Sequence, residues 1–554
     1  MSRGRGWSSG CAPPGGYSER HAPKRAQRGD TPMKLVTVEQ MRALEAAAVG
    51  AGTSEAELME AAGVAVAQET WINMGAVEGR TAIVLVGPGS NGGDGLVSAV
   101  SLKEWGAESA VYLVGDRPAD DPLLQRVVDA EIEVLSAADD PGCEQLVQAM
   151  RGAQGIVDAL LGTGLNRPID GPIKDVLDRL ADARADRTLR PHLVAVDVPS
   201  GVNPNTGTAD PAVVRADTTV ALGFAKVGLF AMPARAIAGT IAEVEIGLPE
   251  GAGDDLPYEE IRMRDLQGLM PFRSDDAHKG TFGTAVIAAG SKFYPGAARL
   301  ASESALRAGA GLIVLAAPES IQPLFAGMSP EVTHHPLPAG EGANGAADGD
   351  SAAELLAALD GREALLIGPG LTNSPGTADF VRGVLGGIDA VEGLQAVVID
   401  ADALNALSEI PDWHEGLSVP RVLTPHPGEM ARLLGTSVDE VQADRLTAAT
   451  EYAQRTGSVV VLKGAGTIVA HPDGRARLSE FASAVLATAG TGDVLAGFIV
   501  SLIAQGMDPY DAAATGVYLH TECGRQLESA VGASTAIAQD LLRALPDTRK
   551  ALDG

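Results

Sequence analysis

The sequence has few cysteines, few basic residues relative to acidic ones, and no long hydrophobic run. Its three cysteines, Cys11, Cys143 and Cys523, lie far apart and form no Cys-X-X-Cys pair. This spacing predicts neither a disulfide framework nor a zinc site. A reduced, cytoplasmic setting fits it best.

The charge balance argues against two kinds of partner. With 42 Lys and Arg against 72 Asp and Glu, the formal net charge is -30, which disfavours a nucleic-acid or anionic-membrane surface. No apolar stretch is long and uninterrupted enough to span a bilayer. Residues 1–32, rich in Gly, Pro and Arg, lack the apolar core of a signal peptide and are predicted to be a disordered extension.

The chain is too long for a single hydrophobic core. Its 554 residues, 45% hydrophobic and 21% charged, predict a soluble globular protein of two or more domains. Residues 248–258 are polar and rich in Gly and Pro, so we expect the domain boundary there. This places one domain at residues 33–250 and another at residues 258–554.

The first half alternates between helical and strand-like patterns. A helical pattern begins at Met33 with a capping box at Thr37 and Gln40, and Ser54 with Glu57 opens a second helix. Buried-strand runs follow at residues 82–86, 110–114, 156–161, 193–197, 219–222 and 241–246. The alternation indicates a doubly wound, mostly parallel sheet, which binds ligands at the carboxyl ends of its strands.

Polar residues follow three of these strands. A glycine-rich turn at residues 87–95 precedes a helix expected to begin near Leu96, a layout that often binds a nucleotide phosphate. Tight packing alone also explains such a turn. Together with this turn, Asp158 and Ser200 supply hard oxygen ligands that suit an alkali or alkaline-earth cation better than zinc. Strand-end acids are equally often helix caps or turn formers.

The second half predicts another α/β sheet. Its strand signals lie at residues 284–289, 312–316, 366–370, 397–402, 423–430 and 459–467, and residues 340–349 are a flexible loop by composition. Lys463, before a glycine-rich turn, either positions nucleotide phosphates or is a solvated lysine leading into a hairpin. His426, between two prolines, is either a rigid substrate contact or an ordinary surface histidine.

The run at residues 488–497 carries the strongest chemical signal. Small residues and glycines give way at Asp493 to an apolar helical pattern, so Asp493 is expected in the first turn of a helix. Free amides and the helix dipole make that terminus an anion site. A carboxylate there suits a general base that activates a hydroxyl to attack a bound phosphate. An N-capping Asp is the alternative.

Taken together, these motifs resemble two fused enzymes. Residues 87–95, 157–162 and 197–201 resemble NAD(P)H-hydrate epimerase, and residues 278–283, 424–429, 463–467 and 490–493 resemble the ribokinase-like, ADP-dependent NAD(P)H-hydrate dehydratase. The resemblance covers nearly everything from Met33 onward. It implies two doubly wound α/β domains, an N-terminal Rossmann-like sheet and a C-terminal ribokinase-like sheet. The implied role is repair of hydrated nicotinamide cofactors, NADHX and NADPHX.

For the first domain the resemblance implies interconversion of the R and S epimers of the hydrate. It places potassium at Asn91, Asp158 and Ser200. It places the hydrate against Ser90, Asn91, Gly92, Gly93, Asp94, Gly162, Thr163, Gly164, Leu165, Asn166, Arg167, Pro168 and Asp197. Ser90 stands where the family usually has Asn, and a hydroxyl reaches less far than an amide.

For the second domain the resemblance implies dehydration of the S epimer to NAD(P)H as ADP becomes AMP and phosphate. It places the hydrate at Ala297, Gly370, His426 and Asp493, and the nucleotide at Lys463, Gly464, Ala465, Gly466, Thr467 and Gly492. Asp493 would deprotonate the ring hydroxyl, which attacks the β-phosphoryl group of ADP. The ring nitrogen's lone pair then helps to expel phosphate. Magnesium is the expected cofactor of this domain, ADP its co-substrate, and a homo-oligomer the expected assembly.

Two other functions remain open from the residues themselves. One is a ribokinase-like small-molecule kinase that leaves a stable phosphate ester and carries an N-terminal regulatory domain. The other treats the first half as a catalytically silent binding module, because its sequence shows no unambiguous acid–base pair.

Overall fold

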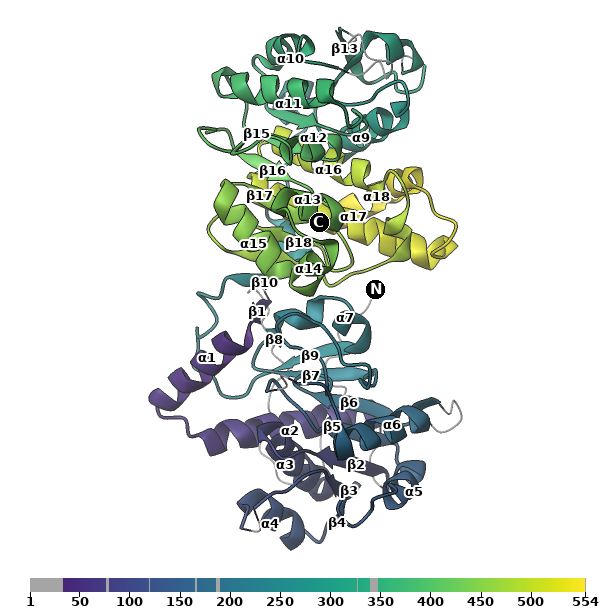
Figure 1. Cartoon of the computed structure of the whole chain (residues 1–554). Coiled ribbons are helices and arrows are strands. Elements are labelled where there is room, and N and C mark those ends of the chain that lie inside the picture. The colour runs from purple at the N-terminus through teal and green to yellow at the C-terminus, as the bar shows by residue number, and fades with distance from the viewer. Residues whose placement is uncertain are drawn as a thin grey trace. The chain divides into compact units, whose positions relative to one another are not determined.

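The computed structural model describes residues 33–75, 79–118, 120–164, 167–185, 190–325, 327–338 and 347–553. The chain divides into two compact units, Met1–Leu256 and Pro257–Gly554 (Figure 1). The predicted extension at residues 1–32, most of the predicted loop at residues 340–349, and the candidate residues Leu165 and Asn166 lie outside the described residues. Among the helices described, none is both long and apolar enough to cross a membrane.

The first unit is built on a parallel sheet with the strand order β4-β3-β2-β5-β6-β7-β9. The strands are β2 (Thr81–Val86), β3 (Glu108–Leu113), β4 (Glu133–Ser136), β5 (Gly155–Ala159), β6 (His192–Val196), β7 (Thr218–Leu222) and β9 (Thr240–Val244). After β2 the chain adds strands on one side, and from β5 it adds them on the other. The crevice at this reversal is where doubly wound sheets bind ligands.

Helices cover both faces of this sheet. They are α2 (Glu55–Met74), α3 (Ser90–Glu104), α4 (Pro122–Asp129), α5 (Glu144–Gly152), α6 (Gly171–Ala185) and the short α7 (Ala234–Ile237). Successive residues of β2 point to opposite faces. Val84 and Val86 pack with Leu96 of α3, whereas Ile83 and Leu85 pack with the helices of the other face. The predicted doubly wound fold is therefore confirmed for this unit.

The N-terminal segment differs from the prediction at its start. The chain first forms a short strand, β1 (Lys34–Val36), which pairs in parallel with β8 (Ala225–Lys226), and helix α1 (Val38–Gly50) begins only after it. The helical pattern predicted from Met33 was therefore wrong for its first residues, because pairing with a distant strand determines their conformation. Both predicted capping boxes, at the starts of α1 and α2, are confirmed.

The predicted start of α3 was also wrong. The helix begins at Ser90 rather than near Leu96, so Gly92 and Gly95 lie within it. A Cβ at Gly92 would lie 2.1 Å from the carbonyl oxygen of Gly87, and one at Gly95 would lie 2.7 Å from the Cβ of Ala159. These glycines let the first turns of the helix approach the preceding loop and β5 closely, in addition to forming a turn.

The second unit has a mixed sheet with the strand order β13-β12-β11-β14-β15-β16-β17-β18-β19-β10. Its strands are β10 (Tyr258–Glu260), β11 (Thr284–Ala288), β12 (Leu312–Pro318), β13 (Thr333–Leu337), β14 (Ala364–Ile367), β15 (Ala396–Ile399), β16 (Arg421–Leu423), β17 (Val459–Leu462), β18 (Ile468–Ala470) and β19 (Ala476–Leu478). The strands from β13 to β17 are parallel, and β18 pairs antiparallel with both of its neighbours. The second predicted α/β sheet is confirmed.

The helices of this unit flank the sheet on its two faces (Figure 1). They are α8 (Met263–Gln267), α9 (Pro295–Ala308), α10 (Ser351–Leu359), α11 (Pro375–Gly387), α12 (Asp402–Leu407), α13 (Pro427–Leu434), α14 (Val438–Ala443), α15 (Arg445–Thr456), α16 (Thr491–Ala504), α17 (Pro509–Val531) and α18 (Ala538–Asp553).

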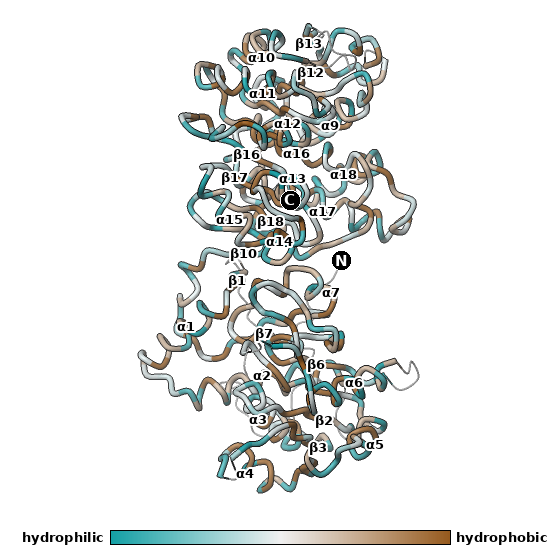
Figure 2. Tube along the Cα trace, viewed as in Figure 1, coloured by the Kyte–Doolittle hydropathy of each residue, from teal (hydrophilic) through white to brown (hydrophobic). Residues whose placement is uncertain are grey.

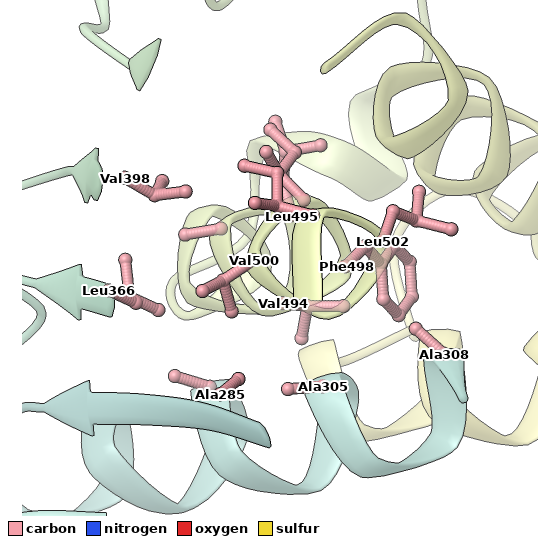
Figure 3. Close-up of a cluster of buried hydrophobic side chains, with 14 of the residues drawn as sticks. Ala285, Ala305, Ala308, Leu366, Val398, Val494, Leu495, Phe498, Val500 and Leu502 are labelled. Atoms are coloured by element: carbon pink, nitrogen blue, oxygen red, sulfur yellow. The ribbon is translucent and has the colours of Figure 1, made fainter. Parts of the chain in front are cut away.

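Helix α16 lies in the hydrophobic core of this unit. Its side chains Val494 and Phe498 pack in one cluster with Ala305 of α9 and Val398 of β15 (Figure 3). Hydrophobic residues are concentrated along this helix (Figure 2), as expected of a helix that is buried all round. A Cβ at Gly497 would lie 1.9 Å from the Ser304 hydroxyl oxygen, so glycine is what permits this close helix packing. The core thereby fixes the N-terminus of α16.

Candidate active sites

The first unit contains a cavity of about 890 Å³ at the carboxyl ends of its central strands. The predicted residues that line it are Ser90, Asn91, Asp94, Gly162, Thr163, Gly164, Arg167 and Asp197. Gly92 and Gly93 lie buried in the first turns of α3, and Pro168 is exposed near the cavity without lining it. Helix α1 forms one wall through residues that include Arg42 and Glu45, which the sequence interpretation did not select.

The three predicted cation ligands lie together beside this cavity. Ser200 donates hydrogen bonds to both carboxylate oxygens of Asp158, from its hydroxyl at 2.6 Å and its backbone N–H at 2.9 Å. Asn91 donates from Nδ2 to the carbonyl oxygen of Leu161 at 3.1 Å, and the Leu161 N–H donates to the Ser200 hydroxyl at 2.9 Å. Hydrogen bonds therefore link the Asp158 carboxylate, the Ser200 hydroxyl, the Leu161 carbonyl group and the Asn91 amide.

The chemistry of this oxygen cluster suits a weakly charged ion. Asp158 is only 2% exposed, and burial raises the pKa of its carboxyl group above the usual range despite the hydrogen bonds from Ser200. Within the described ranges, no group of three or more His, Cys, Asp or Glu side chains could hold a metal ion. Any cation here would rely on one carboxylate and neutral oxygens, the ligand type of hard cations.

A buried lysine beside Asp197 was not predicted. Lys226 is 1% exposed, and its ammonium group donates to the Asp197 carboxylate and, at 3.0 Å, to the carbonyl oxygen of Leu222. The backbone of Asp197 is left-handed, with a φ of 64°, which is uncommon outside glycine. The missed signal was a lone lysine within an otherwise apolar run, where a buried charge needs a partner.

Two further carboxyl groups lie near this ion pair. Burial raises the pKa of Asp94 well above its usual range, and the negative charges of Asp197 and Glu45 raise it further, while Lys226 opposes them. Burial also raises the pKa of Glu45. The cavity therefore holds an ion pair next to a carboxyl group that favours its neutral form.

Arg117 holds the glycine-rich turn in place. Its Nη1 donates to the carbonyl oxygens of Gly87 at 2.9 Å and Gly89 at 3.2 Å, and its Nε pairs with Asp121 at 2.7 Å. No local pattern indicated this contact, because Arg117 follows a different strand, β3. It fixes the loop that forms one edge of the cavity.

In the second unit, Asp493 lies where it was predicted. It is the third residue of α16, half-buried, and the N-cap is Gly490 in a left-handed conformation with a φ of 87°. Asp493 is therefore not the N-cap, so that alternative was wrong. Burial raises the pKa of its carboxyl group to about 7; the charges of Asp400 and Asp402 raise it as well, and Lys463 opposes them.

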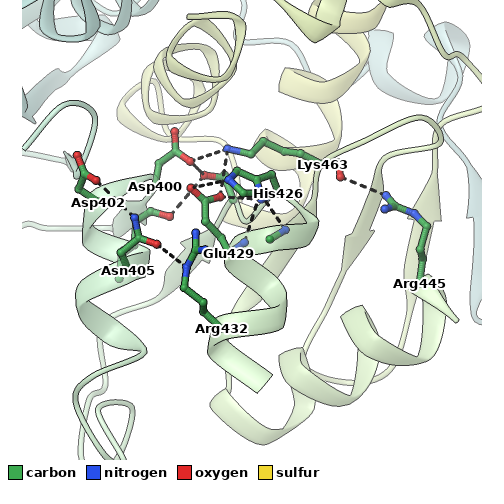
Figure 4. Close-up of polar contacts among 11 residues, drawn as sticks. Asp400, Asp402, Asn405, His426, Glu429, Arg432, Arg445 and Lys463 are labelled. Carbon is green, nitrogen blue, oxygen red and sulfur yellow. Dashed lines mark hydrogen bonds and ion pairs between the residues drawn. The ribbon is translucent and has the colours of Figure 1, made fainter. Parts of the chain in front are cut away.

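Lys463 points into a cluster of carboxylates (Figure 4). Its Nζ lies 2.8 Å from Asp400 Oδ1 and 3.9 Å from Glu429 Oε2, and its side chain is 16% exposed. Burial alone would lower its pKa, but the carboxylates of Asp400 and Glu429 raise it overall. A Cβ at Gly492 would lie 3.5 Å from this Nζ, so Lys463 borders the turn that carries Asp493.

The structural alternative for Lys463 was right about the hairpin and wrong about a solvated lysine, and the role of Lys463 in positioning nucleotide phosphates stays a prediction. The hairpin of β17 and β18 does form, as the structural alternative predicted. The lysine itself is not solvated.

Arg445, buried behind the turn, donates from Nη2 to the carbonyl oxygen of Lys463 at 3.3 Å (Figure 4). The same Nη2 donates to the carbonyl oxygens of Leu462 at 3.1 Å and Gly466 at 3.2 Å. Burial lowers the pKa of Arg445 to about 10. Arg445 thereby fixes the conformation of the predicted nucleotide-binding loop. The sequence analysis missed it because it lies on a separate helix, α15.

His426 has a structural role that the sequence did not show. Its Nδ1 accepts hydrogen bonds from the N–H groups of Gly428 at 2.9 Å and Glu429 at 3.3 Å, so it caps α13. Burial lowers the pKa of His426, as do the nearby charges of Lys463 and Arg432. Because Nδ1 accepts, the proton of the neutral ring lies on Nε2, which is 3.5 Å from Oε1 of Glu429. The predicted contact of His426 with the hydrate stays a prediction.

The remaining predicted hydrate residues lie against each other. Gly370 has a φ of 67°, and a Cβ there would lie 3.0 Å from the Cβ of Ala297 and 2.8 Å from that of Tyr294. The loop before α9 also exposes Phe293 and Tyr294, which are 61% and 55% exposed. Nearby, Thr372 and Ala401 adopt left-handed φ values of 72° and 51°, and such strain clusters at functional sites.

Comparisons with known proteins match both units. A family model described as NAD(P)H-hydrate dehydratase matches residues 285–547, and one described as the YjeF-related protein N-terminus matches residues 55–228. The bifunctional NAD(P)H-hydrate repair enzyme of Moorella thermoacetica is 36% identical over 499 residues, 88% of this chain and 91% of that protein. The enzyme of the same name from Escherichia coli is 36% identical over 84% of this chain and 85% of its own length.

Among solved structures, the ADP/ATP-dependent NAD(P)H-hydrate dehydratase of Bacillus subtilis, co-crystallized with ATP and Mg²⁺, is similar to part of the chain. It is 33% identical, with 53% of this chain and 98% of that chain covered and a TM-score of 0.45.

Proposed function

The chain belongs to the family of bifunctional NAD(P)H-hydrate repair enzymes, and we propose from its two sites that it carries both reactions. The first unit interconverts the R and S epimers of NADHX and NADPHX. The second dehydrates the S epimer to NADH or NADPH and converts ADP to AMP and phosphate.

One observation supports the dehydratase chemistry above all others. Asp493 lies in the first turn of α16 beside Lys463, and the pKa of its carboxyl group is about 7. A general base works best when its pKa lies near the working pH. A base in this position can take a proton from an alcohol next to a phosphate held by the helix N-terminus.

The proposed reaction is a phosphoryl transfer followed by elimination. Asp493 takes the proton of the ring hydroxyl, whose oxygen then forms a bond to the β-phosphorus of ADP as the bond to AMP breaks. Lys463 and the amides of Gly492 and its neighbours offset the charge of the diphosphate. The ring nitrogen's lone pair then expels phosphate and forms a carbon–nitrogen double bond, and loss of a proton from the adjacent ring carbon restores the ring double bond of NAD(P)H. A poor leaving group, hydroxide, has become a good one.

The carboxylates of Asp400 and Glu429 fit a magnesium ion. Both are buried beside Lys463, and the pKa of Glu429 is raised to about 7, first by burial, although Lys463 opposes this. Magnesium typically takes one or two carboxylates and completes its shell with phosphate and water. When bound, the ion would neutralise phosphate charge. A magnesium ion held in this way needs only two protein carboxylates, because phosphate and water supply its other ligands.

Potassium is the cation that we propose for the first unit. Asn91, Asp158 and Ser200, together with the carbonyl oxygen of Leu161, would hold it and fix the loop at the edge of the cavity. Potassium should therefore raise the melting temperature of the protein relative to an equal concentration of choline. Asp158→Asn should remove that difference, and an equal rise in the variant would exclude this site.

The cellular setting rests on sequence evidence. Cys143 and Cys523 are both buried and unpaired, which agrees with the proposal of a reduced, cytoplasmic location. A homo-oligomer stays a prediction.

The decisive assay uses the separated epimers. Purified protein given the S hydrate and ADP should restore the absorbance of reduced nicotinamide and release AMP and phosphate in equal amounts. The R hydrate should be consumed only through conversion to S. A stable phosphorylated product would favour the small-molecule kinase instead. Parallel reactions with ADP and ATP would identify the phosphoryl donor.

A further inference from the structure

The cavity of the first unit holds charged groups that the predicted binding role does not use. We propose that Asp94 and Asp197 form the acid–base pair of epimerisation, with Lys226 and Glu45 as positioning residues that determine which carboxyl group carries the charge. This inference rests on the epimerase function proposed above and gives that function a mechanism.

Asp197 is held as a carboxylate. Lys226 donates to its Oδ1, and the backbone N–H of Leu222 donates to the same oxygen at 3.1 Å. Among the described residues, no side-chain or backbone group donates to Oδ2, and Asp197 lines the cavity. The fixed left-handed backbone and the buried lysine therefore leave one carboxylate oxygen for a substrate proton.

Asp94 is in the opposite state. It is only 7% exposed and lines the same cavity, yet it makes no ion pair or side-chain hydrogen bond with any described residue. The charged groups that act on it are Asp197, Glu45 and Lys226, two negative and one positive. A buried carboxyl group with a surplus of negative neighbours keeps its proton. Two carboxyl groups in opposed environments are the usual arrangement of an acid and a base.

The proposed reaction starts from a protonated Asp94 and an ionised Asp197 in the same cavity. The hydrated ring carbon bears a hydroxyl and adjoins the ring nitrogen. Asp94 gives its proton to that hydroxyl as the carbon–oxygen bond breaks and water leaves with the bonding electrons. The nitrogen lone pair forms a carbon–nitrogen double bond, and water then adds to the other face of the ring as Asp197 takes its proton. The return reaction uses the same pair with the proton on Asp197.

This scheme requires the pair to share one proton in total. The rate should therefore fall at high pH, where Asp94 loses its proton. The other charged groups that line the cavity are Arg42, Glu55 and Arg167, so they contribute to the absolute position of this limb.

The simpler explanation is that Lys226 and Asp197 form a structural ion pair. In that case Lys226→Met would lower stability, and with it activity at every pH, without moving the pH profile. The two explanations therefore differ in the position of the alkaline limb rather than in the size of the rate.

The experiment follows conversion of the R to the S epimer in the full-length protein without ADP, by chromatography, from pH 5 to pH 9, with the uncatalysed rate subtracted. Asp94→Asn and Asp197→Asn should each lower the rate by about 100-fold or more. Glu45→Gln removes a negative charge beside Asp94 and should move the alkaline limb to lower pH. Lys226→Met should move the profile to higher pH, and Lys226→Arg should restore it.

The controls separate the possible failures. Asp182→Asn removes an exposed carboxylate on α6 that does not line the cavity, and it should leave the profile unchanged. Dehydration of the S epimer by the same samples shows that the second unit is intact. A melting curve shows whether the first unit is folded. A wild-type protein that does not interconvert the epimers would overturn the proposed function itself. Wild-type interconversion with the alkaline limb unmoved in both Glu45→Gln and Lys226→Met would overturn only this inference.

Discussion

The two candidate sites use the same electrostatic arrangement with different degrees of burial. In the first unit Lys226 pairs with Asp197 and leaves Asp94 without a partner among the described residues. In the second, Lys463 pairs with Asp400 and leaves Asp493 in the same position. Burial raises the pKa of both remaining carboxyl groups, to about 7 for half-buried Asp493 and well above the usual range for buried Asp94.

The different surroundings of the two carboxyl groups fit the different roles proposed for them, an acid for Asp94 and a base for Asp493. A carboxyl group with a pKa near neutrality is ionised often enough to take a proton, whereas a buried one with a surplus of negative neighbours keeps its proton to give away in the first step. The charges around each unpaired carboxyl group therefore set its role in the first proton transfer at its site.

The largest expected effect comes from removing the base of the second unit. Asp493→Asn keeps the size of the side chain but cannot accept the proton, so dehydration should fall by a factor on the order of a thousand or more. Steady-state assays with the S hydrate, together with calorimetric titration of ADP, would measure this. Normal turnover in the variant, or a matching loss of ADP affinity, would contradict the assigned role.

The next largest effect is expected from replacing Lys463, which pairs with a carboxylate in the second unit as Lys226 does in the first. Lys463→Met removes a cation that lowers the pKa of Asp493, so that pKa should rise and the acid limb of dehydration should move to higher pH. Loss of a charge-assisted contact to phosphate should also raise the KM for ADP by about 10-fold. Lys463→Arg serves as the matched control. If the limb stayed in place, the lysine would act only through nucleotide binding.

A smaller effect tests whether the two sites work separately. Asp158→Ala removes the carboxylate of the proposed potassium site, so use of the R epimer should slow by about 10- to 100-fold. Dehydration of supplied S epimer should continue at the wild-type rate, because Asp158 belongs to the first unit. Reactions started with each epimer would show this. Equal losses on both would argue against two separate active sites.

The smallest effect adjusts the base without removing it. Dehydration by the wild-type protein should fall as the pH drops through about 7, because Asp493 becomes protonated and cannot act as a base. Asp402→Asn removes one of the charges that raise this pKa, so the limb should shift to lower pH by less than about one unit. A pH–rate profile of the two proteins would measure the shift. A shift in the opposite direction would exclude this coupling.

The sequence predicted features that depend on neighbouring residues. The apolar run after Asp493 predicted its place in the first turn of α16, and continuous apolar runs predicted the strands of the sheets. It could not show ion pairs between distant segments. Lys226 and Asp197 are 29 residues apart, and Lys463 and Asp400 are 63 apart. Their pairing depends on which strands become neighbours, so the sequence could not reveal the charge state of either site.

The start of α3 also could not be predicted from neighbouring residues alone. Its glycines read as a turn because glycine is common in turns. Whether a glycine serves a turn or a close contact depends on what lies opposite, here Gly87 and Ala159. Local patterns therefore located the loop but not the point at which the helix begins.

The contact of Gly497 with Ser304 has a consequence for altering substrate preference. Gly497 lies one helical turn beyond Asp493, and any side chain there would force α16 away from α9. The close packing of α16 against α9 thus fixes the position of Asp493 in the pocket. Attempts to evolve new specificity should find tolerant positions in the exposed loop at Phe293 and Tyr294, and almost none along this helix.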